Sequence, residues 1–358
     1  MSLQSRPCPF FASGMIENPN SFIGRKLALD EITARMTASQ PTSINVVGKP
    51  RIGKSSLLYH FCQTYEQRVI QRNRRSEEFV AVFISLQGNG WQREENFYQA
   101  IATALLQRPI VSANPQLSDR LRVQPFDRLA FRQMLEAWKS AKVLPVLCLD
   151  EFDKLLRDRS IFNQSFYQGL RALLDQSLLM LVVSSTKPLD QNSWLSSFFN
   201  LGHTLPLENL TEMEAGDLVQ LPRSNDPSQQ SALSENRQKL ALQWGERHPY
   251  LLQLAAVCLW EAREYDRSNE WARERFEKNA HKAKRYWLDP RGFVSPLRWL
   301  CWDLPSGVGR VVGVLGVKVS DMRNWFVGIA IIVAILALGL GIVNWEQIRE
   351  FLKRLLGF

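Results

Sequence analysis

Two hydrophobic patterns alternate along the first part of the chain. Short apolar runs rich in Val, Ile, Leu and Phe are typical of buried strands, and they occupy residues 43–47, 79–86, 143–149 and 178–183. Longer stretches in which apolar residues return with the spacing of one helix face separate these runs. Because strands alternate with helices, the pattern predicts βαβ units and a parallel sheet.

Helices are predicted between the strands and again beyond them. The first group covers residues 26–38, 56–65, 91–107, 126–141 and 162–176. The second group covers residues 211–220, 234–246, 249–265 and 269–287. Because no strand pattern follows Pro206, we expect an irregular leader at 1–20, an α/β core at 21–206 and an all-α unit at 207–288.

The pattern changes again near the C-terminal end. Residues 289–323 are interrupted by Pro and Gly and are predicted to be a linker. Within it, the sequence leaves open whether Val308–Val319 is a strand pair, a membrane-surface segment or plain linker. The run from Trp325 to Val343 contains no charged residue, and as a helix it would extend about 28 Å, close to the thickness of a bilayer core. With Trp345 as a second interfacial aromatic residue, the run predicts a single transmembrane helix over 324–345.

The residues that flank this run indicate its orientation. More Lys and Arg residues precede it than follow it, so the positive-inside rule places the N-terminal domain in the cytoplasm, and we expect a prokaryotic inner membrane. Residues 346–358 have the spacing of an amphipathic helix that lies in the membrane interface or pairs with a partner. Small residues at Ala330/Ala334 and Ala337/Gly341 leave self-association of the membrane helix open.

A phosphate-binding motif follows the first predicted strand. Residues 48–55, Gly-Lys-Pro-Arg-Ile-Gly-Lys-Ser, match G-x-x-x-x-G-K-[S/T]. Gly48 and Gly53 allow backbone conformations in which successive N–H groups face phosphate oxygens. Lys54 can reach the β- and γ-phosphates, and Ser55 can bind Mg²⁺. A strand before the loop and a helix after it are the context that the motif requires, so we expect a nucleotide site here.

Asp150 and Glu151 directly follow the third predicted strand. The carboxyl ends of parallel strands share one edge of a sheet, so this pair is expected near the phosphate loop. Asp150 can hold Mg²⁺ and Glu151 can orient or deprotonate an attacking water. The cluster Ser185-Thr186-Lys187 follows the next predicted strand. It either supplies a third group near the γ-phosphate or simply leads from the strand into a loop, and the sequence leaves both interpretations open.

The net charge, the cysteines and the histidines indicate which partners and ligands to expect. The net charge of +9 permits contact with nucleic acid or an anionic membrane. The basic run of Arg68, Arg72, Arg74 and Arg75 is interpreted as a solvated surface, and without a recognition helix we do not expect nucleic acid as a partner. Five scattered cysteines without a C-x-x-C pair indicate reduced thiols, and the four histidines lack zinc-ligand spacing.

Four segments together resemble the AAA-related STAND NTPases of bacteria and archaea. They are Phe22-Ile23-Gly24-Arg25, the phosphate loop through Leu58, Leu149-Asp150-Glu151 and His248-Pro249-Tyr250. The resemblance covers roughly residues 20–265. It implies an ATP-binding α/β core followed by a helical lid, with Phe22 to Arg25 bordering the adenine. Lys187 matches the position where the family has a γ-phosphate-sensing Arg, and Lys lacks the planar fork of Arg.

The motifs and the resemblance give one predicted site for ATP and Mg²⁺. The predicted catalytic residues are Lys54, Glu151 and Lys187, and the predicted metal ligands are Ser55 and Asp150. The nucleotide is expected to contact residues of the loop, the first segment and the lid: Phe22, Ile23, Arg25, Gly48, Arg51, Ile52, Gly53, Lys54, Ser55, Ser56, His248 and Pro249.

From these features we expect a membrane-anchored, ATP-hydrolysing STAND-like switch that couples nucleotide state to assembly or a membrane event, in defence or signalling. Its expected partners are ATP and ADP, the lipid bilayer through residues 324–345, a protein partner or trigger, and a second copy of the chain. The alternatives are an AAA-type ATPase of a secretion or envelope-assembly machine and a nucleotide-binding scaffold that does not hydrolyse ATP. A DNA-tethering ATPase is the least favoured alternative.

Overall fold

The computed structural model describes residues 7–88, 90–91, 93–189, 203–222 and 231–287. The chain divides into two compact units, residues 1–280 and 281–358, and nearly all described residues belong to the first. The predicted linker (289–323), membrane helix (324–345) and tail (346–358) lie outside the described residues. Within the part that is described, no helix combines the length and the apolar character needed to cross a membrane.

The predicted parallel sheet is confirmed. Among the described residues it has five strands in the order β2-β3-β4-β1-β5, and every neighbouring pair is parallel. The strands are β1 (Ile44–Val47), β2 (Phe79–Ser85), β3 (Leu144–Asp150), β4 (Met180–Ser185) and β5 (His203–Pro206). The first four lie within one or two residues of their predicted ranges, and β5 was not predicted. β1 lies between β4 and β5, so the loop that follows it lies beside the end of β4 at the same edge of the sheet.

Both faces of the sheet are buried, because alternate residues of a strand point to opposite sides. In β2, Val80 and Val82 belong to one apolar cluster and Ala81 belongs to the other. In β4, Leu181 and Val182 divide in the same way. Two-sided burial explains why these strands read as continuous apolar runs in the sequence.

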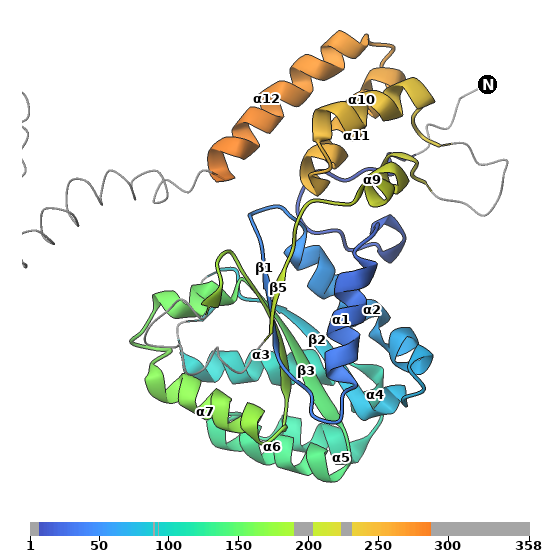
Figure 1. Ribbon diagram of the computed structural model, residues 1–358. Helices are drawn as coiled ribbons and strands as arrows, with labels where there is room; N and C mark the ends of the chain where they lie inside the picture. Colours follow the sequence, from blue (N-terminus) through green and yellow to red (C-terminus); the bar gives the residue numbers. More distant parts are fainter. Residues whose placement is uncertain (1–6, 89, 92, 190–202, 223–230, 288–358) are drawn as a thin grey trace, which may run out of the picture. The chain divides into compact units, whose positions relative to one another are not determined.

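Helices cover each face of the sheet (Figure 1). Helices α1 (Lys26–Met36) and α2 (Lys54–Gln71) pack on one face. Helices α3 (Glu94–Leu106), α6 (Arg128–Ser140) and α7 (Gln164–Asp175) pack on the other, with the short helices α4 (Pro109–Ser112) and α5 (Pro115–Ser118) between α3 and α6. The result is a three-layer α/β/α core.

The residues after β5 that are described form helices only. These are α9 (Glu212–Val219), α10 (Glu235–Gly245), α11 (Pro249–Glu264) and α12 (Asn269–Trp287), close to the four predicted ranges. Helix α11 begins with Pro249, where the missing N–H costs nothing, and it is buried nearly all round. Gly245 permits its close approach to α10, because a Cβ there would lie 2.5 Å from Leu252 Cα. We call the helices α9 to α12 the lid.

Candidate nucleotide-binding site

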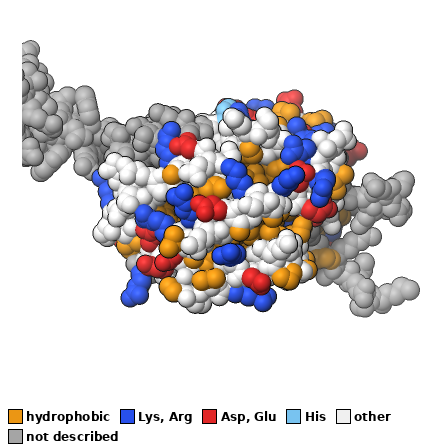
Figure 2. Space-filling model, turned by 90° about the horizontal axis from the view of Figure 1, so that it is seen from below, with side chains coloured by type: hydrophobic (Ala, Val, Ile, Leu, Met, Phe, Trp, Pro, Cys, Tyr) orange, Lys and Arg blue, Asp and Glu red, His pale blue; other side chains and the backbone are white. Residues whose placement is uncertain are grey.

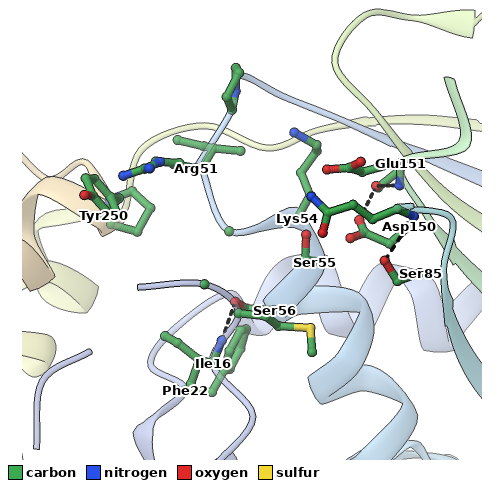
Figure 3. A pocket seen from close by; sticks show the side chains of 18 of the residues that line it. Ile16, Phe22, Arg51, Lys54, Ser55, Ser56, Ser85, Asp150, Glu151 and Tyr250 are labelled. Carbon is green, nitrogen blue, oxygen red and sulfur yellow. Dashed lines mark hydrogen bonds between the residues drawn. The ribbon is translucent and has the colours of Figure 1, made fainter. Parts of the chain in front are cut away.

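A cavity of about 750 Å³ lies at the carboxyl ends of the strands, which is within the usual size range of ligand pockets. Its lining comes from the leader, the segment of Phe22 to Arg25, the phosphate loop, the strand ends, the turn after β3, and the helices α9 and α11. Figure 3 shows Lys54, Asp150 and Glu151 approaching one another from the phosphate loop and β3. Motif residues that are far apart in sequence are therefore brought to one pocket.

The phosphate loop owes its shape to its two glycines. Gly53 has a φ of +98°, which suits glycine, and it directly precedes the first residue of α2. At Gly48 the constraint is space, because a Cβ would lie 2.8 Å from both the Leu207 carbonyl oxygen and Ile52 Cγ2. Arg51 also has a positive φ of 63°. The loop thus leads into the N-terminus of a helix of 18 residues, an arrangement that favours anion binding.

The side chain of Lys54 folds back against the phosphate loop. Its Nζ donates to the carbonyl oxygens of Gly48 at 2.7 Å and Lys49 at 3.2 Å. An ammonium group has three N–H donors, so one is left for a ligand in the pocket. Burial lowers the pKa of Lys54, and the nearby carboxylates of Asp150, Asp153 and Glu151 oppose this effect. The arrangement fits a phosphate group at this position.

The acidic side of the pocket is fixed by Ser184. Its hydroxyl donates to Asp150 Oδ1 at 2.5 Å and accepts the backbone N–H of Glu151 at 2.9 Å. Asp150 is buried with a 5% exposed surface, while Glu151 adopts a left-handed φ of 57° as the chain leaves β3. Asp150 and Ser55 both line the pocket, and their oxygen atoms are the ligands that Mg²⁺ prefers.

The residues at the end of β4 and directly after it divide between the pocket and the surface. Ser184, Ser185 and Thr186 line the pocket, whereas Lys187 is exposed and does not. Ser185 Oγ lies 2.9 Å from Asn45 Oδ1 and 2.7 Å from the Lys187 carbonyl oxygen, which holds this turn against β1. A γ-phosphate contact by Lys187 would require its side chain to swing into the pocket, and this role stays a prediction.

The segment predicted to border the adenine connects the core to the lid. Phe22 lines the pocket and stacks on His60, with ring centroids 4.1 Å apart. Burial, with a smaller contribution from Arg68, lowers the pKa of His60 to about 4, so this ring is neutral at pH 7. The Arg25 guanidinium donates to the Ile52 carbonyl oxygen at 3.0 Å, and the Arg25 backbone N–H donates to Glu214 of α9.

A second contact joins the phosphate loop to the lid. The Arg51 guanidinium lies 4.2 Å from the ring centroid of Tyr250, in the first turn of α11 (Figure 3). Pro249 and Tyr250 line the pocket, while the neighbouring His248 is buried and does not. Tyr250 was part of the motif that carried the resemblance, but its contact with Arg51 was not predicted.

The leader also reaches the pocket, which the sequence did not predict. Residues 11–16 form part of its lining. The Phe11 N–H donates to Gln253 Oε1 of α11 at 2.9 Å, and the Ile16 N–H donates to Ser56 Oγ of α2 at 3.0 Å. Among the described residues of the leader, 7–18 form no helix or strand, and these bonds fasten them to both the lid and the helix that follows the phosphate loop. The Ser56 hydroxyl therefore binds the leader in this structure.

The basic run outside the pocket is largely paired with acidic groups. Arg68 lies 3.0 Å from Asp30, and Arg74 lies 2.9 Å from Glu78. The Arg72 guanidinium donates to the Asp30 carbonyl oxygen. The face drawn in Figure 2 carries basic and acidic side chains side by side rather than one continuous basic patch. These contacts favour the interpretation of the run as a solvated surface.

One family model matches the part of the chain that carries the phosphate loop. Residues 36–192 match the AAA domain. The matched range runs from the end of α1 past β4 and includes both the phosphate loop and the Asp150-Glu151 pair. No curated protein sequence matches the chain.

One solved structure supports the assignment of the fold, and a second is similar at a lower level. The chain is similar to the Walker-type ATPase PABY2304 of Pyrococcus abyssi, with 14% identity, a TM-score of 0.53, and coverage of 88% of this chain and 90% of that chain. The ORC1 protein of Aeropyrum pernix in complex with DNA gives 15% identity, a TM-score of 0.48, and coverage of 91% and 87%. We base the fold on the first similarity alone: an α/β P-loop NTPase core followed by helices.

Proposed function

We propose that the chain is an ATP-hydrolysing molecular switch, similar to STAND NTPases, in which bound nucleotide controls the lid. One observation carries this proposal: the phosphate loop touches the lid directly. Arg51 of the loop contacts Tyr250 of α11, and Arg25 connects the Ile52 carbonyl oxygen to Glu214 of α9. A ligand that rearranges the loop therefore acts on two lid helices at once.

The residues around the pocket suit hydrolysis of ATP. Lys54 and the loop N–H groups bind the phosphates, and Phe22 with the leader forms the wall beyond them. Mg²⁺, held by Ser55 and Asp150, would neutralise phosphate charge. Glu151 lies at the strand end as the base that takes a proton from the attacking water.

The coupling between loop and lid is small enough to be reversible. A cation–π contact such as that of Arg51 with Tyr250 contributes about 0.5–2 kcal/mol. Losing or gaining it changes the ratio of two lid positions by about 2- to 30-fold. Amide hydrogen exchange in the first turn of α11, with and without Mg-ATP, tests this function.

We further propose that residues 324–345 anchor the chain in a membrane as one helix, with the ATPase unit in the cytoplasm. The support is the uncharged run from Trp325 to Val343 and the excess of basic residues before it. In a membrane-bound chain, nucleotide-dependent movement of the lid would be passed to assembly with a partner or to a membrane event, in defence or signalling.

Alkaline carbonate extraction tests the anchor. The full-length protein is expected to stay in the membrane pellet, because the apolar run is long enough to span the bilayer. The double variant Ala334→Lys/Leu338→Lys is the matched control; each Lys costs about 2.5–3.5 kcal/mol at the centre of a membrane helix, so this variant is expected in the supernatant. Release of the wild-type chain by carbonate would refute the anchor.

A further inference from the structure

The turn after β3 carries basic side chains into the pocket. Residues Phe152–Arg157 form a 3₁₀ helix directly after Glu151. Lys154 and Arg157 from this turn line the pocket together with Lys54. Lys187, at the position where the resemblance predicts the γ-phosphate sensor, is exposed and outside the lining. The described pocket therefore has cations at its acidic end, but they come from the turn after β3.

Lys154 is paired with the proposed catalytic base. Its Nζ lies 2.5 Å from Glu151 Oε2, and both side chains are partly shielded, with exposed fractions of 30% and 35%. One oxygen of Glu151 is therefore occupied by the pair instead of facing a water molecule. The base is thus held back while the pair is intact.

Other contacts hold the neighbouring charged side chains in place, whereas Lys154 can move. Asp150 is fixed by the Ser184 hydroxyl, and Lys54 is fixed by the carbonyl oxygens of Gly48 and Lys49. Asp153 Oδ2 lies 3.4 Å from the Thr186 hydroxyl. Lys154 sits on a flexible stem with Glu151 as its ion-pair partner, so a more highly charged anion in the pocket can attract it away.

We propose that Lys154 senses the γ-phosphate: the terminal phosphate of ATP takes Lys154 from Glu151 and thereby frees the base. ADP has no γ-phosphate and leaves the pair intact. In the step that follows, a water oxygen bonds to the γ-phosphorus as the bond from that phosphorus to the β–γ bridging oxygen breaks. ADP leaves with the bonding electrons, and the water proton passes to Glu151. Lys154 is a positioning residue: it holds the Glu151 carboxylate in the ion pair until Lys154 itself contacts the phosphate.

This inference rests on the proposed function, and the effect of Lys154→Met on nucleotide affinity tests it. In full-length protein with Mg²⁺, we expect the variant to bind ATP about tenfold more weakly, since one charge-assisted contact to the γ-phosphate is lost. ADP affinity should stay within about twofold of wild type, because ADP never contacts Lys154 in this scheme. Lys154→Arg, which keeps a cation, should restore most of the ATP affinity. Lys239→Met, a change of an exposed lysine in α10, is the matched control and should alter neither affinity.

A double-mutant cycle with Glu151→Gln separates sensing from a purely structural role. Removing the charge of Glu151 leaves Lys154 free to meet the phosphate, so we expect tighter ATP binding in the Lys154 background. That gain should shrink severalfold in the Lys154→Met background, which shows that the two side chains are coupled. Lys154→Gln serves in the same cycle if the Met variant is misfolded by circular dichroism.

Different outcomes identify which claim fails. Equal losses of ATP and ADP affinity in Lys154→Met, or no loss of either, would overturn the sensor while leaving ATP binding intact. An additive cycle would also overturn it. If the wild-type protein binds neither nucleotide, the proposed function fails first and the sensor fails with it.

Discussion

Lys54→Ala is expected to abolish ATP binding, with an affinity loss of about 100-fold or more. The ammonium group is the part of the Lys54 side chain that can meet a phosphate, and charge-assisted bonds to phosphate are among the strong ones. The same group holds the carbonyl oxygens of Gly48 and Lys49 together, so its removal also loosens the loop. Titration calorimetry with ATP and Mg²⁺ measures the effect.

Lys49→Ala is the matched control for this variant. Lys49 lies in the same loop, is exposed and does not line the pocket, and its carbonyl oxygen remains after the substitution. We expect its ATP affinity to stay within about threefold of wild type, because no phosphate contact is lost. Binding by Lys54→Ala that equals binding by Lys49→Ala would remove the phosphate loop from its role.

Glu151→Gln is expected to lower the rate of ATP hydrolysis by about 10²- to 10⁴-fold, the usual contribution of a positioned general base. The amide keeps the size of the side chain but does not accept the water proton. Binding of ATP should persist, because Glu151 itself makes no phosphate contact and Lys54 and the loop keep theirs. Single-turnover release of phosphate from saturating ATP measures the rate without interference from product release.

Glu77→Gln makes the same chemical change far from the cavity. Glu77 is exposed in the turn before β2, and its distance of 3.9 Å to Arg75 marks only a loose ion pair. Its hydrolysis rate should equal that of wild type. If Glu151→Gln hydrolyses ATP as fast as Glu77→Gln, then Glu151 is not the base and the attacking water must be activated elsewhere.

Strands β2 and β3 could be predicted closely because their burial is visible in the sequence. A parallel strand covered on both faces must be apolar at successive positions, and β2 and β3 accordingly appear as unbroken runs. Strand β5 lacks this signal. It pairs with β1 alone among the described strands, and its sequence of His, Thr, Leu and Pro has one buried residue. An edge strand of this kind depends on the sheet already present.

Helix α2 shows how the chemistry of the loop sets an element boundary. The apolar spacing predicted a helix over 56–65, but the helix begins at Lys54, inside the motif, and continues to Gln71. Its last turns are charged and exposed on most sides, and Val69 is the buried residue that keeps them against the core. Periodicity alone therefore underestimates a helix whose ends are polar.

Some parts of the candidate site could be predicted from short sequence motifs, whereas others depend on contacts between residues that are far apart in the chain. The phosphate loop and the Asp150-Glu151 pair are contiguous motifs and could be read directly from the sequence. The bond between Phe11 and Gln253 joins residues 242 positions apart, and the contact of Arg51 with Tyr250 joins the loop to α11. No local spacing encodes such contacts, because they exist only after the lid has folded against the core.

Amide hydrogen exchange of the wild-type protein with Mg-ATP, with Mg-ADP and without nucleotide tests the switch most directly. The predicted result is slower exchange in three segments with ATP: residues 48–56, the leader at 11–16 and the first turn of α11 at 249–253, with weaker protection of the last segment in ADP. Tyr250→Leu should reduce the protection of α11 and leave that of the loop unchanged. Protection confined to residues 48–56, with no difference between ATP and ADP at α11, would contradict nucleotide control of the lid.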